Sequence, residues 1–253
     1  MSFEKTLTAV GLQYTPPSPS PQRMLKDRFS VLNSECSQAD WHRKFVSPAI
    51  RHKEYDLCID ELAPRGHSNI FTGQLLTKDF CSQAIGLAEE AAAWTNDRHE
   101  NYPTTDVLIS DLGLNALYEN NVLSEYIYPL AKQLWRLVGK EWDPQNRVSE
   151  TFLVKYSPDT QAHLSLHHDS SDYTCVVALN DEFEGGGTYF DRQQLLSNGG
   201  VGSFTLHPGN ITHRHGARAV TAGVRYVLIS FVNALPEIDS HPSSLLGVDI
   251  KEK

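Results

Sequence analysis

Two histidines and an aspartate stand together in the stretch SLHHDSSDYTCVVALN, residues Ser165 to Asn180. His167 and Asp169 are two positions apart, so in an extended segment their side chains point to the same side. His168 then points away, where a surface position or support of its neighbours is expected. One imidazole and one carboxylate on one side supply two of the three protein ligands in a two-histidine, one-carboxylate metal site.

The third ligand of such a site is a second histidine, and LHPGNITHRHGARAVTAGVRY offers three, His207, His213 and His215. His213 and His215 share one side of an extended segment, so alternation alone does not choose between them. His207 precedes Pro-Gly and is expected to be a turn histidine bonded to the backbone. This ligand set leaves coordination positions open, which suits non-haem Fe(II) and oxygen chemistry, although catalytic zinc can use the same ligands.

Arg225 stands alone among apolar residues in GVRYVLISFV. A buried guanidinium without a partner is costly, so an anionic group is expected to meet it, and arginine binds carboxylates with two parallel hydrogen bonds. A dicarboxylate with one end on the metal and the other on Arg225 would satisfy both sites, and 2-oxoglutarate is such a compound. The alternative is a structural arginine paired with an acid of the chain.

Helical patterns precede a β-rich region. The spacing predicts a helix over Thr77–Trp94, capped by Thr77, and a second over Leu123–Val138 that Pro129 weakens or kinks. Asp106–Leu112 is predicted to be a strand between them. The segment from Met24 to Glu61 has a mixed pattern that places no element.

After Arg147, short β-rich runs are separated by Gly, Pro, Asp and Asn: ETFLVKYS, YTCVVALN, GTYF, VGSFTLHP and GVRYVLISFVN. Helices followed by closely spaced short strands predict an α+β chain with a barrel or sandwich core. The glycines Gly185 to Gly187 lack the Lys of a phosphate-binding loop and are expected to form a turn or bulge.

Seven pieces keep their order over about Tyr102 to Val232: YPTTD, FLVKYSPDTQ, LHHDSSDYT, VALN, FEGGGTYF, LHPGNITHRHG and GVRYVLISFV. In them the chain resembles the catalytic domain of the procollagen-lysine 2-oxoglutarate dioxygenases, the lysyl hydroxylases. The resemblance implies a double-stranded β-helix (jelly-roll) core with N-terminal packing helices. It also implies Fe(II), 2-oxoglutarate, O2 and ascorbate, and often a homodimer.

By the same resemblance, His167, Asp169 and His215 are the iron ligands, His215 being the histidine ten positions before Arg225. Arg225 would pair with the far carboxylate of 2-oxoglutarate, and Tyr156 would offer its hydroxyl to the same group. The chain departs from the family at Val176, where asparagine is common, which puts a detail of co-substrate contact in doubt.

The expected activity is hydroxylation of an aliphatic C–H bond, most simply of a lysine residue in a protein or peptide, with succinate and CO2 as co-products. Prolyl or free amino-acid and small-molecule hydroxylation stay open, as does a non-catalytic metal-binding barrel. Asp106 and Asp172 are candidates to hold a cationic substrate side chain, against the simpler interpretation as surface or capping acids.

Composition and charge indicate which classes of partner the chain is expected to bind. The net charge is −9, with no basic face to meet phosphates, so nucleic-acid binding is not expected. No membrane span or secretory signal is evident, which favours a cytoplasmic location. The four cysteines show no CxxC pair and are expected to be reduced thiols.

We expect an N-terminal extension at 1–61, partly Pro/Ser-rich, a dioxygenase domain at 62–235 and a tail at 236–253.

Overall fold

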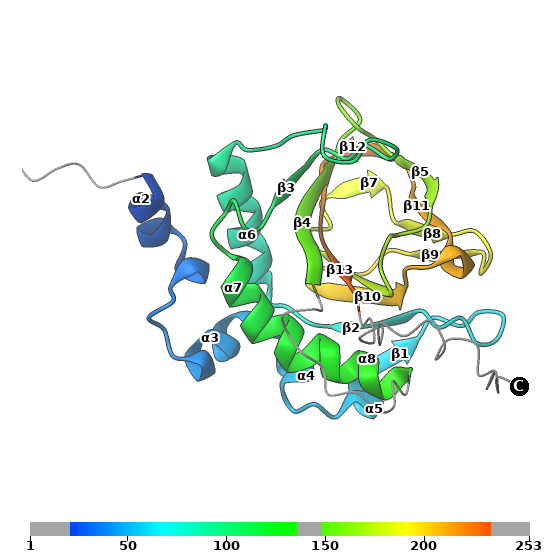
Figure 1. The fold of residues 1–253 in the computed structure, drawn as a ribbon, viewed down its shortest axis with the longest axis horizontal. Helices are drawn as coiled ribbons and strands as arrows, with labels where there is room; N and C mark the ends of the chain where they lie inside the picture. The colour runs from blue at the N-terminus through cyan, green and yellow to red at the C-terminus, as the bar shows by residue number, and fades with distance from the viewer. Residues whose placement is uncertain (1–20, 136–147, 234–253) are drawn as a thin grey trace, which may run out of the picture.

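The computed structural model describes residues 21–135 and 148–233. Its largest element is a seven-stranded antiparallel sheet (Figure 1). Its strands run in the order β1-β2-β10-β6-β13-β4-β3. Their bounds are β1 Ile59–Glu61, β2 Phe71–Gln74, β10 Ser203–Pro208, β6 Tyr173–Ala178, β13 Arg225–Val232, β4 Val148–Tyr156 and β3 Asp106–Leu108.

A four-stranded antiparallel sheet, in the order β5-β11-β8-β9, lies across from the larger one (Figure 1). Its strands are β5 Leu164–His167, β11 His215–Ala217, β8 Thr188–Phe190 and β9 Leu195–Ser197. A third pair joins β12 Val220–Gly223 to β7 Phe183–Gly185. The two larger sheets both contribute side chains to one cavity of about 570 Å³.

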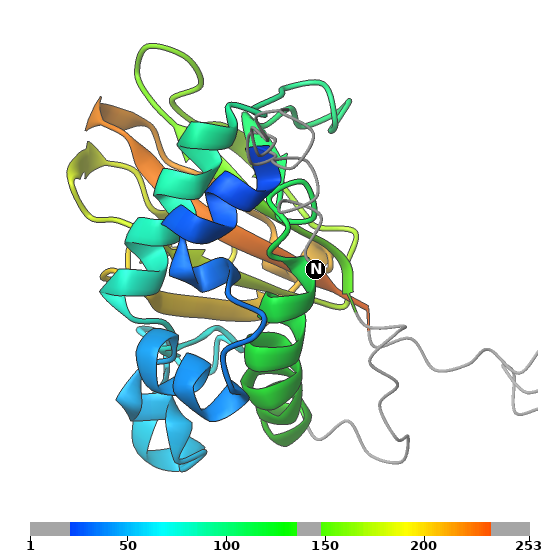
Figure 2. The same cartoon turned by 90° about the vertical axis from the view of Figure 1, so that its left-hand side faces the viewer.

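The helices gather on the other side of the seven-stranded sheet (Figure 2). They are α2 Pro21–Arg28, η1 Ser30–Leu32, α3 Gln38–Phe45, α4 Pro48–Arg51, α5 Tyr55–Cys58, α6 Lys78–Ala91, α7 Asn115–Tyr118, the π-helix η2 Glu119–Ile127 and α8 Tyr128–Leu134, with the 3₁₀ turn η4 Ile211–His213 near the site. Within the described ranges, no helix is long and apolar enough to cross a bilayer.

The alternation of side chains along β13 separates the core from the cavity. Leu228 and Val232 join the large apolar core together with helix residues such as Phe80 and Val122. Four alternate residues of the same strand line the cavity instead: Arg225, Val227, Ile229 and Phe231. The sheet is thus sealed by helices on one face and open to a ligand-sized space on the other.

The helix expected at Thr77–Trp94 is confirmed as α6, where the Thr77 hydroxyl accepts from the Phe80 N–H. The second expected helix begins earlier, at Asn115, and continues through the π-helix η2 into α8. Pro129 lies in the first turn of α8, a position that tolerates proline. Residues 136–138 of that prediction lie outside the described residues.

All five β-rich runs after residue 147 contain strands, β4, β6, β8, β10 and β13, so the α+β prediction is confirmed. The strand expected over Asp106–Leu112 ends at Leu108, because a turn follows in which Gly113 takes a φ of 70°. The Pro/Ser-rich stretch up to residue 20 and the tail at 236–253 lie outside the described residues. The described part of the N-terminal extension packs on the same core through Trp41 and Phe45.

Gly202 makes a close approach between β10 and the turn before α6. Its carbonyl accepts from both Leu75 and Leu76 N–H groups, its φ is 79°, and an added Cβ would lie 2.0 Å from the Leu76 carbonyl oxygen. We predict that Gly202→Ala lowers the free energy of unfolding by about 2 kcal/mol. Gly200→Ala, where a Cβ would meet nothing within 4 Å, should change it by less than about 0.5 kcal/mol in the same urea titration. Equal effects at the two positions would show that the close approach at Gly202 does not require glycine.

Candidate metal centre

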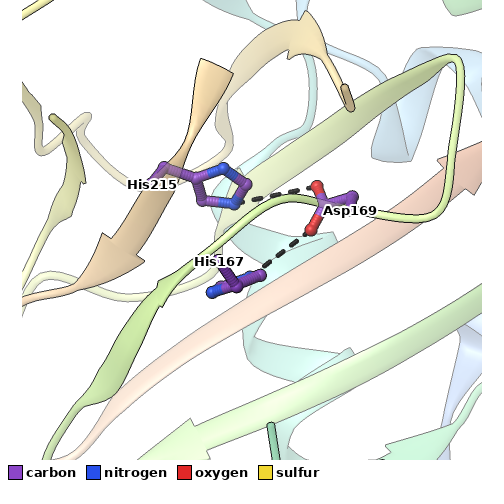
Figure 3. A group of neighbouring side chains, drawn as sticks. All are labelled: His167, Asp169 and His215. Carbon is purple, nitrogen blue, oxygen red and sulfur yellow. Dashed lines mark ion pairs between the residues drawn. The ribbon is translucent and has the colours of Figure 1, made fainter. Parts of the chain in front are cut away.

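His167, Asp169 and His215 converge at one end of the four-stranded sheet (Figure 3). His167 ends β5, His215 begins β11, and the two residues are direct partners in the antiparallel register. Asp169 follows in the turn after β5. Its Oδ1 lies 3.4 Å from His167 Nε2 and its Oδ2 lies 3.7 Å from His215 Nε2. The three ligand atoms lie within 4.8 Å of one another, so one ion can contact all of them.

Backbone carbonyls set the tautomer of both histidines. His167 Nδ1 lies 2.8 Å from the Ser165 carbonyl oxygen, and His215 Nδ1 lies 2.9 Å from that of His213. A carbonyl only accepts, so each Nδ1 carries the proton and each Nε2 lone pair is free for a metal.

The charges also fit a divalent cation. Burial alone would raise the pKa of Asp169, but the adjacent His167 and His215 and a hydrogen bond from Thr174 hold that pKa well below its usual range, so the carboxylate is ionised. Burial lowers the pKa of His215, which keeps that imidazole neutral. Burial opposes protonation of His167, but the adjacent Asp169 carboxylate and the Ser165 carbonyl favour it, and the net effect raises the pKa of His167. Two imidazole nitrogens and one carboxylate, with further positions open, suit Fe(II).

Thr174 on β6 fixes the Asp169 carboxylate, a role that the spacing of ligands did not reveal. Its Oγ1 donates to Asp169 Oδ2 at 2.5 Å, and Ser171 Oγ lies 2.8 Å from the same hydroxyl. Asp169 N–H donates to the Gly209 carbonyl at 2.8 Å. Both the side chain and the backbone of the aspartate are therefore held before any ion arrives.

Arg225 lies buried in the same cavity, with 5% of its surface exposed. Its Nη2 donates to Thr188 Oγ1 at 3.3 Å, and its guanidinium carbon lies 5.5 Å from the ring centre of Tyr156. No carboxylate among the described residues pairs with it. Burial raises the pKa of Tyr156 to about 12, so that phenol stays protonated and can donate. A buried guanidinium with only hydroxyl neighbours calls for an anionic ligand.

The remaining expected residues take varied positions. Val176 lines the cavity, and His168 is exposed at its rim. The side chain of His213 turns away to the Ser68 carbonyl, 2.8 Å from its Nε2, so the sheet register brings His215 and not His213 to the site.

The two candidate acids for a cationic substrate are not free in the cavity. Asp106 is fully buried and accepts from Arg98 and Thr104, and Asp172 is exposed on the surface. Gly185 to Gly187 form the expected turn, each with a positive φ, and the four cysteines are free thiols.

Comparison with known proteins identifies relatives of this chain. The chain is 31% identical over 212 residues to a multifunctional procollagen lysine hydroxylase and glycosyltransferase of Rattus norvegicus. It is 30% identical over 222 residues to a procollagen-lysine, 2-oxoglutarate 5-dioxygenase of Drosophila melanogaster. These alignments cover 77% and 82% of the chain. The chain is a relative of the lysyl hydroxylases.

The match to the lysyl hydroxylases concerns only part of those proteins, since the chain spans 27% of the rat protein and 29% of the fly protein. No family model matches the chain. Among solved structures, a viral collagen prolyl hydroxylase from Paramecium Bursaria Chlorella virus-1 in its 2-oxoglutarate complex superposes with a TM-score of 0.49 at 14% identity, covering 66% of this chain and 97% of that one. A 2-oxoglutarate–Fe(II) oxygenase of Burkholderia pseudomallei gives 0.48 at 12% identity, over 80% and 93%.

Removal of the Thr174 hydroxyl tests how far the carboxylate depends on it. We predict that Thr174→Val weakens Mn(II) binding by about 10-fold or more, because the Asp169 carboxylate loses its donor while the side-chain volume is kept. Thr174→Ser retains the hydroxyl and should bind within about twofold of the wild type. Calorimetric titration of Mn(II) measures both, and a Val variant that binds like the wild type would show that Asp169 is held without Thr174.

Proposed function

We propose that the chain carries an Fe(II)- and 2-oxoglutarate-dependent dioxygenase that hydroxylates an aliphatic C–H bond of a lysine residue in a protein or peptide, with succinate and CO2 as co-products. The observation that carries this proposal is that the His167–Asp169–His215 triad and the unpaired Arg225 open into one cavity. The lysine substrate is supported by the relatives, a procollagen lysine hydroxylase and glycosyltransferase and a procollagen-lysine, 2-oxoglutarate 5-dioxygenase.

Each side chain has a defined part in the proposed site. His167, His215 and Asp169 would hold Fe(II), which supplies activation of O2 coupled to oxidative decarboxylation of 2-oxoglutarate, with ascorbate keeping the metal reduced. Arg225 would bind the far carboxylate of 2-oxoglutarate with two N–H donors, and the Tyr156 and Thr188 hydroxyls lie beside it. The side chain of Val176 would exclude water on the same wall.

The fold proposed for residues 62–235 is a double-stranded β-helix. Two antiparallel sheets across one cavity, with the triad at strand ends of the smaller sheet, support this assignment. Residues 1–61 would act as an extension, and its described part, from residue 21, packs helices on the core behind the larger sheet and adds β1 to that sheet.

The cavity wall away from Arg225 favours a cationic side chain. Arg98 donates to both Asp106 and Glu150, and it stacks 5.2 Å from the ring centre of Phe152. Two carboxylates meet one guanidinium, so this cluster keeps one net negative charge. Glu150 is the more exposed acid, with 28% of its side chain accessible against 0% for Asp106, and it lines the cavity. A lysyl ammonium can therefore approach Glu150.

Succinate formation from 2-oxoglutarate in air, with Fe(II) and ascorbate, tests the activity. We predict that Arg225→Gln raises the KM for 2-oxoglutarate by about 100-fold, because a buried charge-assisted pair is lost. Arg218→Gln is the matched control, since Arg218 stacks on Tyr189 outside the cavity lining, and its KM should be unchanged. A wild type that binds Mn(II) but neither binds nor turns over 2-oxoglutarate would leave a metal-binding barrel and reject the dioxygenase.

Glu150 tests the cationic substrate. We predict that Glu150→Gln weakens binding of a lysine-containing peptide about fivefold, as expected for a partly exposed ion pair, and leaves an otherwise identical norleucine peptide unaffected. Fluorescence anisotropy with Mn(II) and 2-oxoglutarate measures both peptides. Glu184→Gln, an exposed acid outside the cavity lining, should affect neither. Equal loss with both peptides would argue against charge recognition at Glu150.

A further inference from the structure

His207 is a fully buried histidine near the proposed metal centre with no part in the ligand set. It lies near the end of β10, and none of its surface is exposed. Its Nδ1 lies 2.9 Å from the Pro208 carbonyl oxygen, so Nδ1 carries the proton and donates. Its Nε2 has no hydrogen-bond partner anywhere in the ranges that the structure describes. The turn histidine expected from the sequence is thus bonded to the backbone, but it is also packed deep in the fold.

The ring of His207 packs directly on the ligand His215. Their ring centres are 4.6 Å apart, with an interplanar angle of 67°. Phe190 completes a cluster of three rings, 4.9 Å from His207 and 5.4 Å from His215. His207 belongs to the seven-stranded sheet, whereas Phe190 and His215 belong to the four-stranded sheet. The cluster therefore fixes the ligand-bearing strand β11 relative to the larger sheet.

A buried imidazole with an unpaired nitrogen lowers the stability of the fold more than an apolar ring of the same size would. An unsatisfied buried acceptor costs about 1–3 kcal/mol, and a phenylalanine would fill nearly the same volume without it. What phenylalanine lacks is the Nδ1–H, whose bond to Pro208 fixes the plane of the ring. An edge-on contact constrains the neighbouring ring only if the first ring is itself held.

We propose that His207 is a positioning residue of the metal centre, whose backbone-anchored ring holds the His215 imidazole with its Nε2 turned toward Asp169 and His167. The proposal rests on the metal centre of the proposed function. It assigns His207 no bond to the metal, since its nitrogen falls outside the group of mutually close ligand atoms. The role combines two properties, an aromatic ring and an N–H donor, and two substitutions separate them.

His207→Phe keeps the ring and removes both the anchor and the unpaired nitrogen. We predict that it binds Co(II) about 10-fold more weakly or worse, with an altered visible spectrum of the bound ion, while its unfolding midpoint does not fall. His207→Asn keeps a donor for the Pro208 carbonyl and loses the ring, and it should also bind Co(II) about 10-fold more weakly. Co(II) alone is the probe, so the readout does not depend on turnover.

His42 is the matched control. It is a half-buried histidine of α3, outside the cavity lining, whose Nδ1 lies 3.1 Å from the Tyr126 hydroxyl and whose Nε2 is also unpartnered within the described residues. His42→Phe should leave the Co(II) affinity and spectrum unchanged.

An intact spectrum and wild-type affinity in His207→Phe would overturn the proposal. Should that variant not fold, the same result in His207→Asn would overturn it. Failure of the wild type itself to bind Co(II) would reject the metal centre, and with it the role of His207. A wild type that binds Co(II) but makes no succinate would reject only the dioxygenase activity.

Discussion

The buried carboxylate of Asp169 is the constraint on which the site depends. Only 2% of its side chain is exposed, and an ionised carboxylate so far from water is stable only with several donors or a cation. Thr174 supplies a donor from β6, and His167 and His215 bring imidazoles from β5 and β11. The groups that surround the Asp169 carboxylate therefore come from both sheets, so the two sheets must lie close together at this point. The two imidazoles compensate its negative charge only in part. A divalent ion held by the triad would complete that compensation.

Arg225 presents the opposite problem in the same cavity, a buried positive charge with hydroxyl neighbours. No acid among the described residues neutralises Arg225, and the two histidines beside Asp169 compensate its charge only in part, so the protein alone carries a stability cost at two places. A small dianion that bridges a metal and a guanidinium removes both costs at once. The electrostatics thus favour a co-substrate with two carboxylate ends over a neutral ligand of the same size.

The sequence predicted these features unequally, for physical reasons. The rule that residues two apart in an extended segment share a side correctly placed His167 and Asp169 together, although β5 ends at His167 and Asp169 lies in the turn that follows. That rule is local. It could not choose between His213 and His215, since the choice depends on the pairing of β5 with β11, nearly fifty residues apart in the chain. Thr174 and Thr188 were missed for the same reason, because their partners come from other strands. The backbone bond of His207 was predicted correctly, but its contact with His215 on another strand was not. The short helices between Met24 and Glu61 offered too few turns for a helical period to show, although Trp41 and Phe45 are buried core residues.

The helix layer also bears on the chemistry, because the larger sheet has two unlike faces. On β13, Leu228 points into the apolar core under the helices while Arg225 and Val227 point into the cavity. A strand cannot shift or rotate without moving both sets, since neighbouring side chains alternate on one backbone. Packing behind the sheet therefore fixes the position of the guanidinium in front of it. The same logic applies at β10, where Leu206 is part of the helix-facing core and the next residue, His207, packs on a metal ligand. The helices stabilise the fold, and through these alternating strands they also hold the site in the geometry that a metal and a dicarboxylate require.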